Sequence, residues 1–221
     1  MPLDTPASSA GTMKLVGGDP CLDFVNTVGG RVPAMGGARA RVRNDKLVSY
    51  PDLVAFCVHA GLVGERPGRR LLRLGQARPR AARAALERAL AFREALFRTL
   101  QLRMRGRRPS PADLEVLNAE VLACRSREAL AARHEGLHWE WRDPAERPEA
   151  PLWLVVRATA TLLTSRELVR LRQCGGDACG WLFLDWSRNR RRRWCSMDDC
   201  GNLEKVRRFR QRRAPRPESD L

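Results

Sequence analysis

The hydrophobic residues of the chain recur mainly at helical spacing. The longest periodic segment runs from about residue 80 to residue 105, where apolar side chains return every three or four positions and define one helical face. Ser110 precedes a proline and an acidic first turn, which predicts a second helix that ends near Cys124. Residues 151–163 form the most apolar predicted helix of the chain. These segments indicate a largely helical protein.

Shorter patterns complete the expected order of elements. A short helix is expected around residues 22–28, and a further one opens at Tyr50-Pro51-Asp52 and stops at Gly61. The Gly- and Arg-rich stretch 29–45 predicts a loop, and residues 64–79 predict a surface connection. Residues 138–142 alternate polar and aromatic side chains, which is typical of a strand. Its partner would come from residues 125–137 or from a segment near the N-terminus.

Composition adds a strong positive charge to this picture. The 41 Lys and Arg residues outnumber the 25 Asp and Glu residues, which gives a formal net charge of +16 and an isoelectric point near 11.1. Such an excess favours a polyanionic partner, and nucleic acid is a commoner one than a membrane surface. Only three basic residues are lysines, a bias that a GC-rich coding sequence also produces, so the location of the charge matters more than its total.

No segment of the sequence has the pattern of a membrane span or of a secretory signal. The most hydrophobic run ends after five residues at Arg157, and residues 1–12 lack a basic start followed by an apolar stretch. We therefore expect a cytoplasmic protein without a membrane partner. In a reducing compartment the seven cysteines favour metal binding over a disulfide framework.

Four cysteines near the C-terminus form two matched pairs. Cys174 and Cys179 are separated by four residues, as are Cys195 and Cys200, and fifteen residues lie between the pairs. Two such pairs predict a closed site of four sulfur ligands, the arrangement of one structural zinc ion. The alternatives are scattered core thiols or a redox dithiol, and the redox interpretation leaves one of the two pairs unexplained.

The residues around these cysteines predict a small zinc module of the treble-clef or zinc-ribbon type. Trp181–Leu184 and Arg192–Trp194 would be the strands of a hairpin with a turn at Ser187–Arg190, and a helix would follow from about Leu203 to Arg213, with Val206 and either Phe209 or Arg210 on its inner face. Four aromatic side chains are expected to pack around the metal. They are Trp181, Phe183, Trp186 and Trp194.

Basic residues concentrate in the same module. Eleven Lys and Arg residues against five acidic residues give residues 174–213 a formal net charge of +6. A charge run is often only a solvated face, but arginines on a hairpin tip and along an adjoining helix favour contact with phosphates. The candidate nucleic-acid-binding residues are Arg188, Arg190, Arg191, Arg192, Arg193, Lys205, Arg207, Arg208, Arg210, Arg212 and Arg213.

Two parts of the sequence resemble one known family. The run from Gly17 to Thr27 (GGDPCLDFVNT) resembles the opening motif of the ABATE domain of stress-induced bacterial transcription regulators. The segments around Cys179-Gly180-Trp181, Arg193–Met197 and Cys200-Gly201-Asn202 resemble the CGNR zinc finger that follows this domain. The resemblance implies DNA binding and, in some members, RNA binding. Leu203 stands where the family has arginine, so any contact made by that arginine would be missing here.

These observations predict an α+β protein with a mostly α-helical N-terminal domain, a minor β element and the small C-terminal module. We expect a disordered tail at 1–12, an ABATE-like domain at 13–170, the zinc finger at 171–213 and a second tail at 214–221. The expected function is a DNA-binding transcription regulator whose N-terminal domain senses a small-molecule ligand or forms a homodimer. An RNA-binding or protein-interaction module is the alternative.

Other polar residues carry weaker signals. Asp23 and Asn26 lie in an apolar segment, where they would either line a ligand pocket or cap a neighbouring loop. Cys21, Cys57 and Cys124 are expected to fill the core. The sequence shows no nucleophile elbow and no phosphate-binding loop, so we expect no enzyme.

Overall fold

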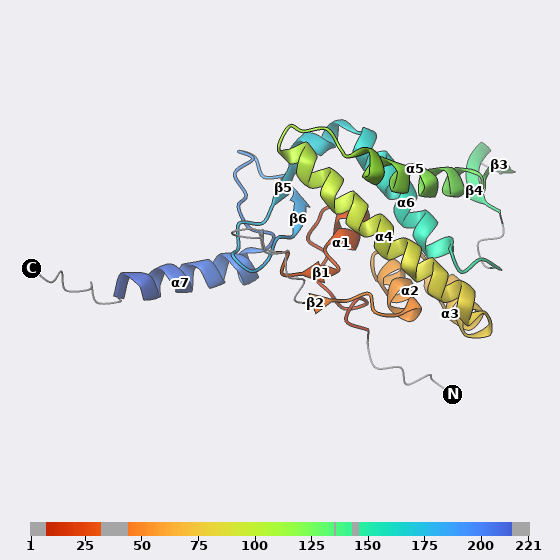
Figure 1. Ribbon diagram of the computed structural model, residues 1–221, viewed down its shortest axis with the longest axis horizontal. Coiled ribbons are helices and arrows are strands. Elements are labelled where there is room, and N and C mark those ends of the chain that lie inside the picture. The colour runs from red at the N-terminus through yellow and green to blue at the C-terminus, as the bar shows by residue number, and fades with distance from the viewer. Residues whose placement is uncertain (1–7, 32–43, 135, 143–145, 214–221) are drawn as a thin grey trace, which may run out of the picture.

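The computed structural model describes residues 8–31, 44–134, 136–142 and 146–213 (Figure 1). Its α-helices are α1 (Pro20–Val25), α2 (Tyr50–His59), α3 (Glu65–Ala77), α4 (Pro79–Met104), α5 (Pro111–Arg125), α6 (Ala150–Thr164) and α7 (Asn202–Arg213). The short 3₁₀ helix η3 (Arg166–Arg170) precedes β5, and the short π-helix η4 (Met197–Gly201) precedes α7. The predicted α+β class, mostly helical with small sheets, is confirmed.

Helix α4 is the centre of the helical layer, and α1, α2, α3 and α5 pack against it (Figure 1). Its buried side carries alanines in its first half, Ala82, Ala85 and Ala89, and larger side chains after them, such as Phe92 and Leu96. Alanines let neighbouring helices approach closely, and the larger side chains fill the space between them. No helix of the described residues is both long and apolar enough to cross a membrane.

The expectation of a surface connection at residues 64–79 was wrong, because most of that segment is helix α3. Its two internal glycines, which suggested a loop, are buried points of close approach. A Cβ atom at Gly68 would collide with Val58, and one at Gly75 would collide with the Tyr50 ring. Leu71 is buried between them. Tertiary packing therefore outweighs the unfavourable helix propensity of glycine here.

Three two-stranded antiparallel sheets surround the helices. β1 (Val28–Gly29) pairs with β2 (Asn44–Asp45) on either side of a segment outside the described residues. β3 (Glu128–Arg133) pairs with β4 (Gly136–Trp141), so the partner of the predicted strand comes from residues 125–137 and not from the N-terminus. β5 (Leu171–Gln173) pairs with β6 (Leu182–Leu184).

The pairing of β6 corrects the predicted zinc hairpin. β6 was expected to pair with the return segment Arg192–Trp194, but its partner is β5, which comes before the first cysteine. Leu171, Leu182 and Leu184 are buried in the main core together with the helices. The return segment forms no strand, and it is held by backbone and side-chain hydrogen bonds instead. The module is therefore not a separate globule, because its strands belong to the core of the whole chain.

Two further expectations, one near each end of the chain, differ from the structure. Residues 8–12 are part of the described structure, where Ala10 is fully buried and the Ser8 hydroxyl donates to Asp52 at 2.6 Å. The rest of that expected tail, the tail at 214–221 and most of the loop at 29–45 lie outside the described residues. At the other end, α7 exposes the side chains of Val206 and Phe209, so the inner face expected for this helix is absent from the described part of the chain.

Candidate metal centre and nucleic-acid interface

Four sulfur atoms meet at the start of the C-terminal module. Cys174 follows β5, Cys179 lies in the turn after it, Cys195 precedes η4 and Cys200 lies within η4. All four Sγ atoms lie within 4.8 Å of one another, and the Cys179–Cys195 and Cys195–Cys200 pairs are each 3.6 Å apart. A tetrahedral ion with bonds of about 2.3 Å requires sulfur atoms roughly 3.8 Å apart. The cluster fits a closed zinc site of four thiolates.

Backbone groups hold this cluster in place from several sides. The Cys174 N–H donates to the Trp181 carbonyl at 2.8 Å, and the Cys195 N–H donates to the Cys174 sulfur at 3.3 Å. Gly175 N–H donates to the carbonyl of Arg193 at 2.8 Å, which links the two cysteine pairs. An N–H that points at sulfur favours the thiolate over the thiol. These hydrogen bonds hold the two cysteine pairs next to each other.

The charge balance of the cluster also favours a cation. Hydrogen bonding to the Cys174 sulfur raises the pKa of Cys179 to about 12, and the same contact raises the pKa of Cys195. Hydrogen bonds from Cys179 and Cys195 in turn lower the pKa of Cys174 to about 2. Crowding of the four sulfur atoms thus opposes the ionisation of all of them together. A divalent ion removes this repulsion and is needed for all four to act as thiolates.

The aromatic residues around the cluster divide into two groups. Phe183 is buried against Cys174 and Cys195, and Trp181 and Trp194 pack beside them, as predicted. Trp186 does not join them: its ring is half exposed and lies under the Arg170 guanidinium at 4.4 Å. The small apolar cluster around the metal is thus built from three of the four predicted aromatic residues.

The loop between the cysteine pairs is organised by a buried carboxylate. Asp185, fully buried at the end of β6, accepts hydrogen bonds from the backbone N–H groups of Ser187 at 2.9 Å and Arg192 at 3.0 Å. These bonds close the loop and turn its middle toward solvent. Arg190 at the tip adopts a left-handed backbone with φ of 49°. The sequence offered no signal for Asp185 beyond its position next to an apolar strand.

Arg192 differs from the other arginines of this loop. Its guanidinium donates to the carbonyl oxygens of Trp194 and Cys195 and lies over the Phe183 ring at 4.4 Å. It therefore holds the chain next to a zinc ligand, and this engaged position argues against a place in the predicted phosphate-contacting set. Arg188, Arg190, Arg191 and Arg193 are exposed.

The remaining candidate residues lie on α7, which projects away from the rest of the molecule (Figure 1). Lys205, Arg207, Arg208 and Arg210 are exposed. Arg207 pairs with Asp177, and Arg208 donates to Glu204 at 2.9 Å. Arg212 and Arg213 belong to the same helix, but their side chains are outside the described structure. Leu203 is exposed on the first turn, so an arginine there would be accessible to a ligand.

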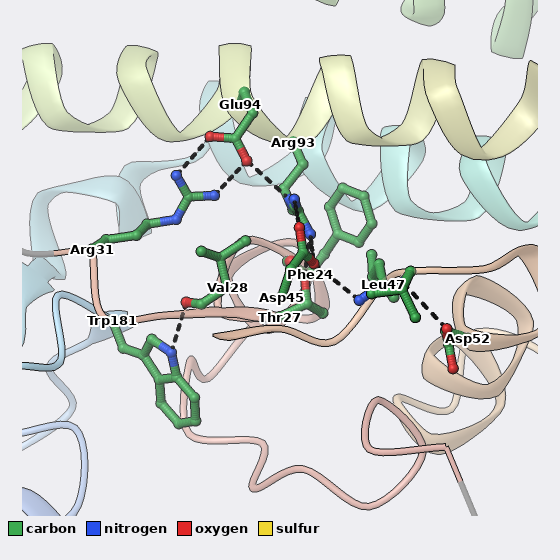
Figure 2. A network of polar contacts seen from close by, with 11 residues as sticks. Phe24, Thr27, Val28, Arg31, Asp45, Leu47, Asp52, Arg93, Glu94 and Trp181 are labelled. Atoms are coloured by element: carbon green, nitrogen blue, oxygen red, sulfur yellow. Dashed lines mark hydrogen bonds and ion pairs between the residues drawn. The ribbon is translucent and has the colours of Figure 1, made fainter. Parts of the chain in front are cut away.

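The helical domain and the zinc module are joined by the family motif at residues 17–27 and by the segment that follows it. The Asn26 side chain donates to the Leu182 carbonyl and accepts from the Leu182 N–H, each at 2.8 Å. The Leu184 N–H donates to the Gly17 carbonyl at 2.8 Å, and the Trp181 ring donates to the Val28 carbonyl at 3.0 Å (Figure 2). Gly180, with φ of 74°, lies against the Arg31 backbone, where a Cβ atom would clash.

These contacts define the roles of Asp23 and Asn26. The Asp23 carboxylate accepts from the N–H groups of Val16 at 2.9 Å and Gly17 at 2.8 Å. Both residues are buried, and their side chains bond to backbone groups of neighbouring segments. The hydrogen bonds match the capping role considered for the two residues and not the ligand pocket. Sequence reasoning identified both residues but missed that Asn26 binds the β6 backbone to α1.

Two charged pairs fix the segments on either side of residues 32–43 to α4. Arg31 donates two hydrogen bonds of 2.6 Å to Glu94, and Arg93 donates to both oxygens of Asp45 at 2.7 and 2.8 Å (Figure 2). Burial raises the pKa of Asp45, but the Arg93 hydrogen bonds outweigh it and hold that pKa below its ordinary value. Arg31 and Arg93 are almost fully buried, so each depends on its carboxylate partner to offset the cost of removing its charge from water.

Comparisons with known families give a match for each of two parts of the chain. The family model of ABATE, described as "Putative stress-induced transcription regulator", matches residues 18–166, and the model of the CGNR zinc finger matches residues 170–213. A search of curated proteins finds no match. The zinc-finger match and the four-cysteine cluster together confirm the prediction of one structural zinc ion. Since the first match covers most of the sequence, the chain belongs to the ABATE family and carries a CGNR zinc finger at its C-terminal end.

Proposed function

We propose that this protein is a DNA-binding transcription regulator in which the zinc ion supports a basic surface that contacts phosphates. The observation that carries the proposal is the set of exposed basic residues on one loop and one projecting helix, both attached to the metal centre. The zinc ion has a structural role only. It ties the loop and the start of α7 to the core, and the arginines supply the contacts with the ligand.

The charge of this surface survives metal binding. Residues 174–213 have a formal charge of +6 with neutral thiols. A zinc ion with four thiolates adds −2, which leaves +4 on the module. The ion pairs of Arg207 and Arg208 are exposed to water, so they are weak and can be exchanged for phosphate contacts. Both features favour a polyanionic ligand.

The four exposed loop arginines provide the test. In the variant R188Q/R190Q/R191Q/R193Q, Arg192 stays in place because it holds the metal centre. If all four contact duplex phosphates, the slope of log K against log salt should become less negative by roughly 3.6, from about 0.9 per contact. Affinity should fall alike for all sequences, while the zinc content and circular dichroism stay at the parent values.

A matched control removes the same charge elsewhere. Arg66, Arg70, Arg73 and Arg80 are exposed on α3 and at the start of α4. Their replacement by Gln should leave the salt slope near that of the parent. If the two quadruple variants lose affinity and slope equally, the effect is one of total charge and the loop is not the interface. Arg192→Gln, in contrast, should weaken zinc retention.

The alternative ligand class is RNA, or an acidic protein that uses the same surface. Arginines that contact phosphates can bind the backbone of DNA or of RNA. Competition of duplex DNA, duplex RNA and single-stranded RNA for one labelled DNA probe separates them. Preference for RNA at every salt concentration would replace the DNA proposal, and failure of all three to compete would favour a protein partner.

The helical domain supports a sensing role through one cavity. About 700 Å³ of space lies between α2, α3 and α4, lined mainly by apolar side chains such as Leu72, Ala82 and Leu86. Tyr50 also lines it, and its buried hydroxyl has no hydrogen-bond partner among the described residues. A buried hydroxyl without a partner is costly, and a small, mostly apolar ligand with one polar acceptor would satisfy it. We propose this cavity, and not Asp23 and Asn26, as the ligand site.

A further inference from the structure

The β3–β4 hairpin exposes an apolar face at the end of the molecule opposite α7 (Figure 1). Leu130 pairs across the ladder with Trp139, and Ala132 pairs with Leu137, so these four side chains share one face. The exposed fractions are 59% for Leu130, 73% for Leu137 and 57% for Trp139. A two-stranded hairpin is marginally stable in water by itself, so an exposed apolar face of this kind indicates a partner surface.

The hairpin is attached to the body at its base. Trp141 stacks on Trp153 of α6 with ring centroids 5.9 Å apart, and the Arg157 guanidinium lies 5.2 Å from the Trp141 ring centroid. In the part of the chain that the structure describes, no third strand pairs with β3 or β4. The outer edge of β4 is therefore open for strand addition.

The register shows which backbone groups face this edge. The Arg142 N–H donates to the Arg127 carbonyl at 2.8 Å, just beyond the ladder. Hydrogen-bonded pairs alternate in an antiparallel ladder, so residues 140, 138 and 136 also direct their N–H and C=O groups toward β3. The backbone groups of Leu137, Trp139 and Trp141 then point outward. Their side chains lie on the apolar face, so edge pairing and apolar contact can form together.

We propose that a second copy of this chain pairs with the β4 edge in antiparallel orientation about Trp139, which makes a four-stranded sheet across a two-fold axis. At this register Trp139 lies opposite the partner's Trp139, and Leu137 lies opposite the partner's Trp141. His138 lies opposite the partner's Glu140, and Glu140 opposite the partner's His138. Such an isologous contact joins the apolar rows of the two copies side by side on one face of the sheet and closes the dimer.

Charge selects this register over its neighbours. Within one chain His138 and Glu140 are already 2.8 Å apart on the same face. A shift of the axis by one residue to either side would place two histidines or two glutamates opposite each other at the centre. Only the axis at Trp139 pairs each His138 with a carboxylate of the other chain. Each copy carries a formal charge of +16, so the two copies repel each other. Contact through the hairpins reduces this repulsion, because it keeps the two basic modules far apart.

The first test is the state of association of the full chain. Sedimentation equilibrium should show a monomer–dimer equilibrium, and Trp139→Glu should raise the dissociation constant by roughly tenfold or more, because the central cross-strand pair then repels. Val169 of η3 is 57% exposed, as is Trp139, and lies just before β5 in the chain, so Val169→Glu is the matched control and should leave dimerisation unchanged. Circular dichroism should match the parent for both variants.

The second test reads the register directly. A His138→Cys chain mixed with a Glu140→Cys chain should form a disulfide-linked dimer under mild oxidation, and neither chain alone should do so. Exchange of the two charges is a further check. Glu140→Lys should weaken dimerisation, and H138E/E140K should restore it, which a loss of folding in the first variant would not explain. A parent that stays monomeric at high concentration, or cross-links that form equally in each single variant, would overturn the proposal. The dimer does not depend on whether the protein binds DNA.

Discussion

At the scale of single residues, burial separates side chains that look alike in the sequence. Arg192 is one of four consecutive arginines, yet it alone bonds the carbonyls next to a zinc ligand and covers Phe183. Arg190 and Arg191 beside it are exposed. Their difference arises from Asp185, which accepts the Arg192 N–H and thereby directs that one residue inward.

Asp23 gives a prediction on the same scale. Burial raises its pKa to about 6 from an ordinary value of 3.8, against the lowering effect of the Gly17 and Val16 N–H groups. Because the folded pKa is the higher one, the folded state binds the proton more tightly, and stability is lost as the pH rises from about 4 through 6. Asp23→Asn keeps an oxygen for both N–H groups and removes the charge.

The variant should therefore be more stable than the parent above pH 7, by about 3 kcal/mol. The difference should shrink as the pH falls through 6 and nearly vanish near pH 4. Urea unfolding of both proteins across this range measures the difference and cancels the titration of other groups. A difference that stays constant with pH would mean that the carboxylate is as well solvated when folded as when unfolded.

At the scale of elements, the sequence predicted those whose signals are local. The cap Ser110, the start at Tyr50-Pro51-Asp52 and the regular apolar face of α4 placed three helices, and the paired cysteines placed the metal centre. Helix α3 was missed because its buried glycines matter only through contact with Val58 and Tyr50. The β5–β6 pairing was missed for a similar reason, since the choice of β5 over residues 192–194 depends on packing of Leu171 and Leu182 against distant helices.

That pairing changes the expected effect of zinc removal. Leu182 and Leu184 are buried in the main core, and Asn26 holds the Leu182 backbone, so β6 has support that the metal does not supply. The segments 174–180 and 185–201 rest on the small cluster of Cys174, Phe183 and Cys195. Chelation of zinc should unfold these segments locally and leave β5, β6 and the helices folded.

Hydrogen exchange followed by mass spectrometry measures this outcome segment by segment. Peptides that cover 185–201 should lose protection in the chelated protein, whereas peptides that cover 182–184 and α4 should keep it. Cys195→Ser should give the same pattern. If β6 loses protection together with the loops, then the zinc module folds as an independent unit and the Asn26 contacts are secondary.

At the scale of the whole molecule, the two proposed surfaces lie at opposite ends, with α4 and its neighbouring helices between them (Figure 1). In the proposed dimer the two-fold axis is perpendicular to the four-stranded sheet, so the two hairpins point in opposite directions along their strands. The helical bodies of the two copies are then attached at opposite ends of the sheet along the strand direction. Each body carries its basic module away from the sheet. A dimer of this shape holds its DNA-contacting surfaces apart instead of placing them on neighbouring half-sites one helical turn apart.

Together the two proposals predict that the dimer bridges separate DNA duplexes. Two short duplexes with donor and acceptor dyes, too short to bend back on themselves, should show energy transfer in the presence of the parent protein and zinc. Trp139→Glu should abolish the transfer and still bind each duplex, because its basic module is unchanged. The R188Q/R190Q/R191Q/R193Q variant should remain a dimer and lose binding and transfer together. Equal bridging by the parent and by Trp139→Glu would place the second DNA-binding surface on the same chain. A parent dimer that holds only one duplex would place both modules on a single site, and the β4 pairing would have to be replaced by a side-by-side arrangement.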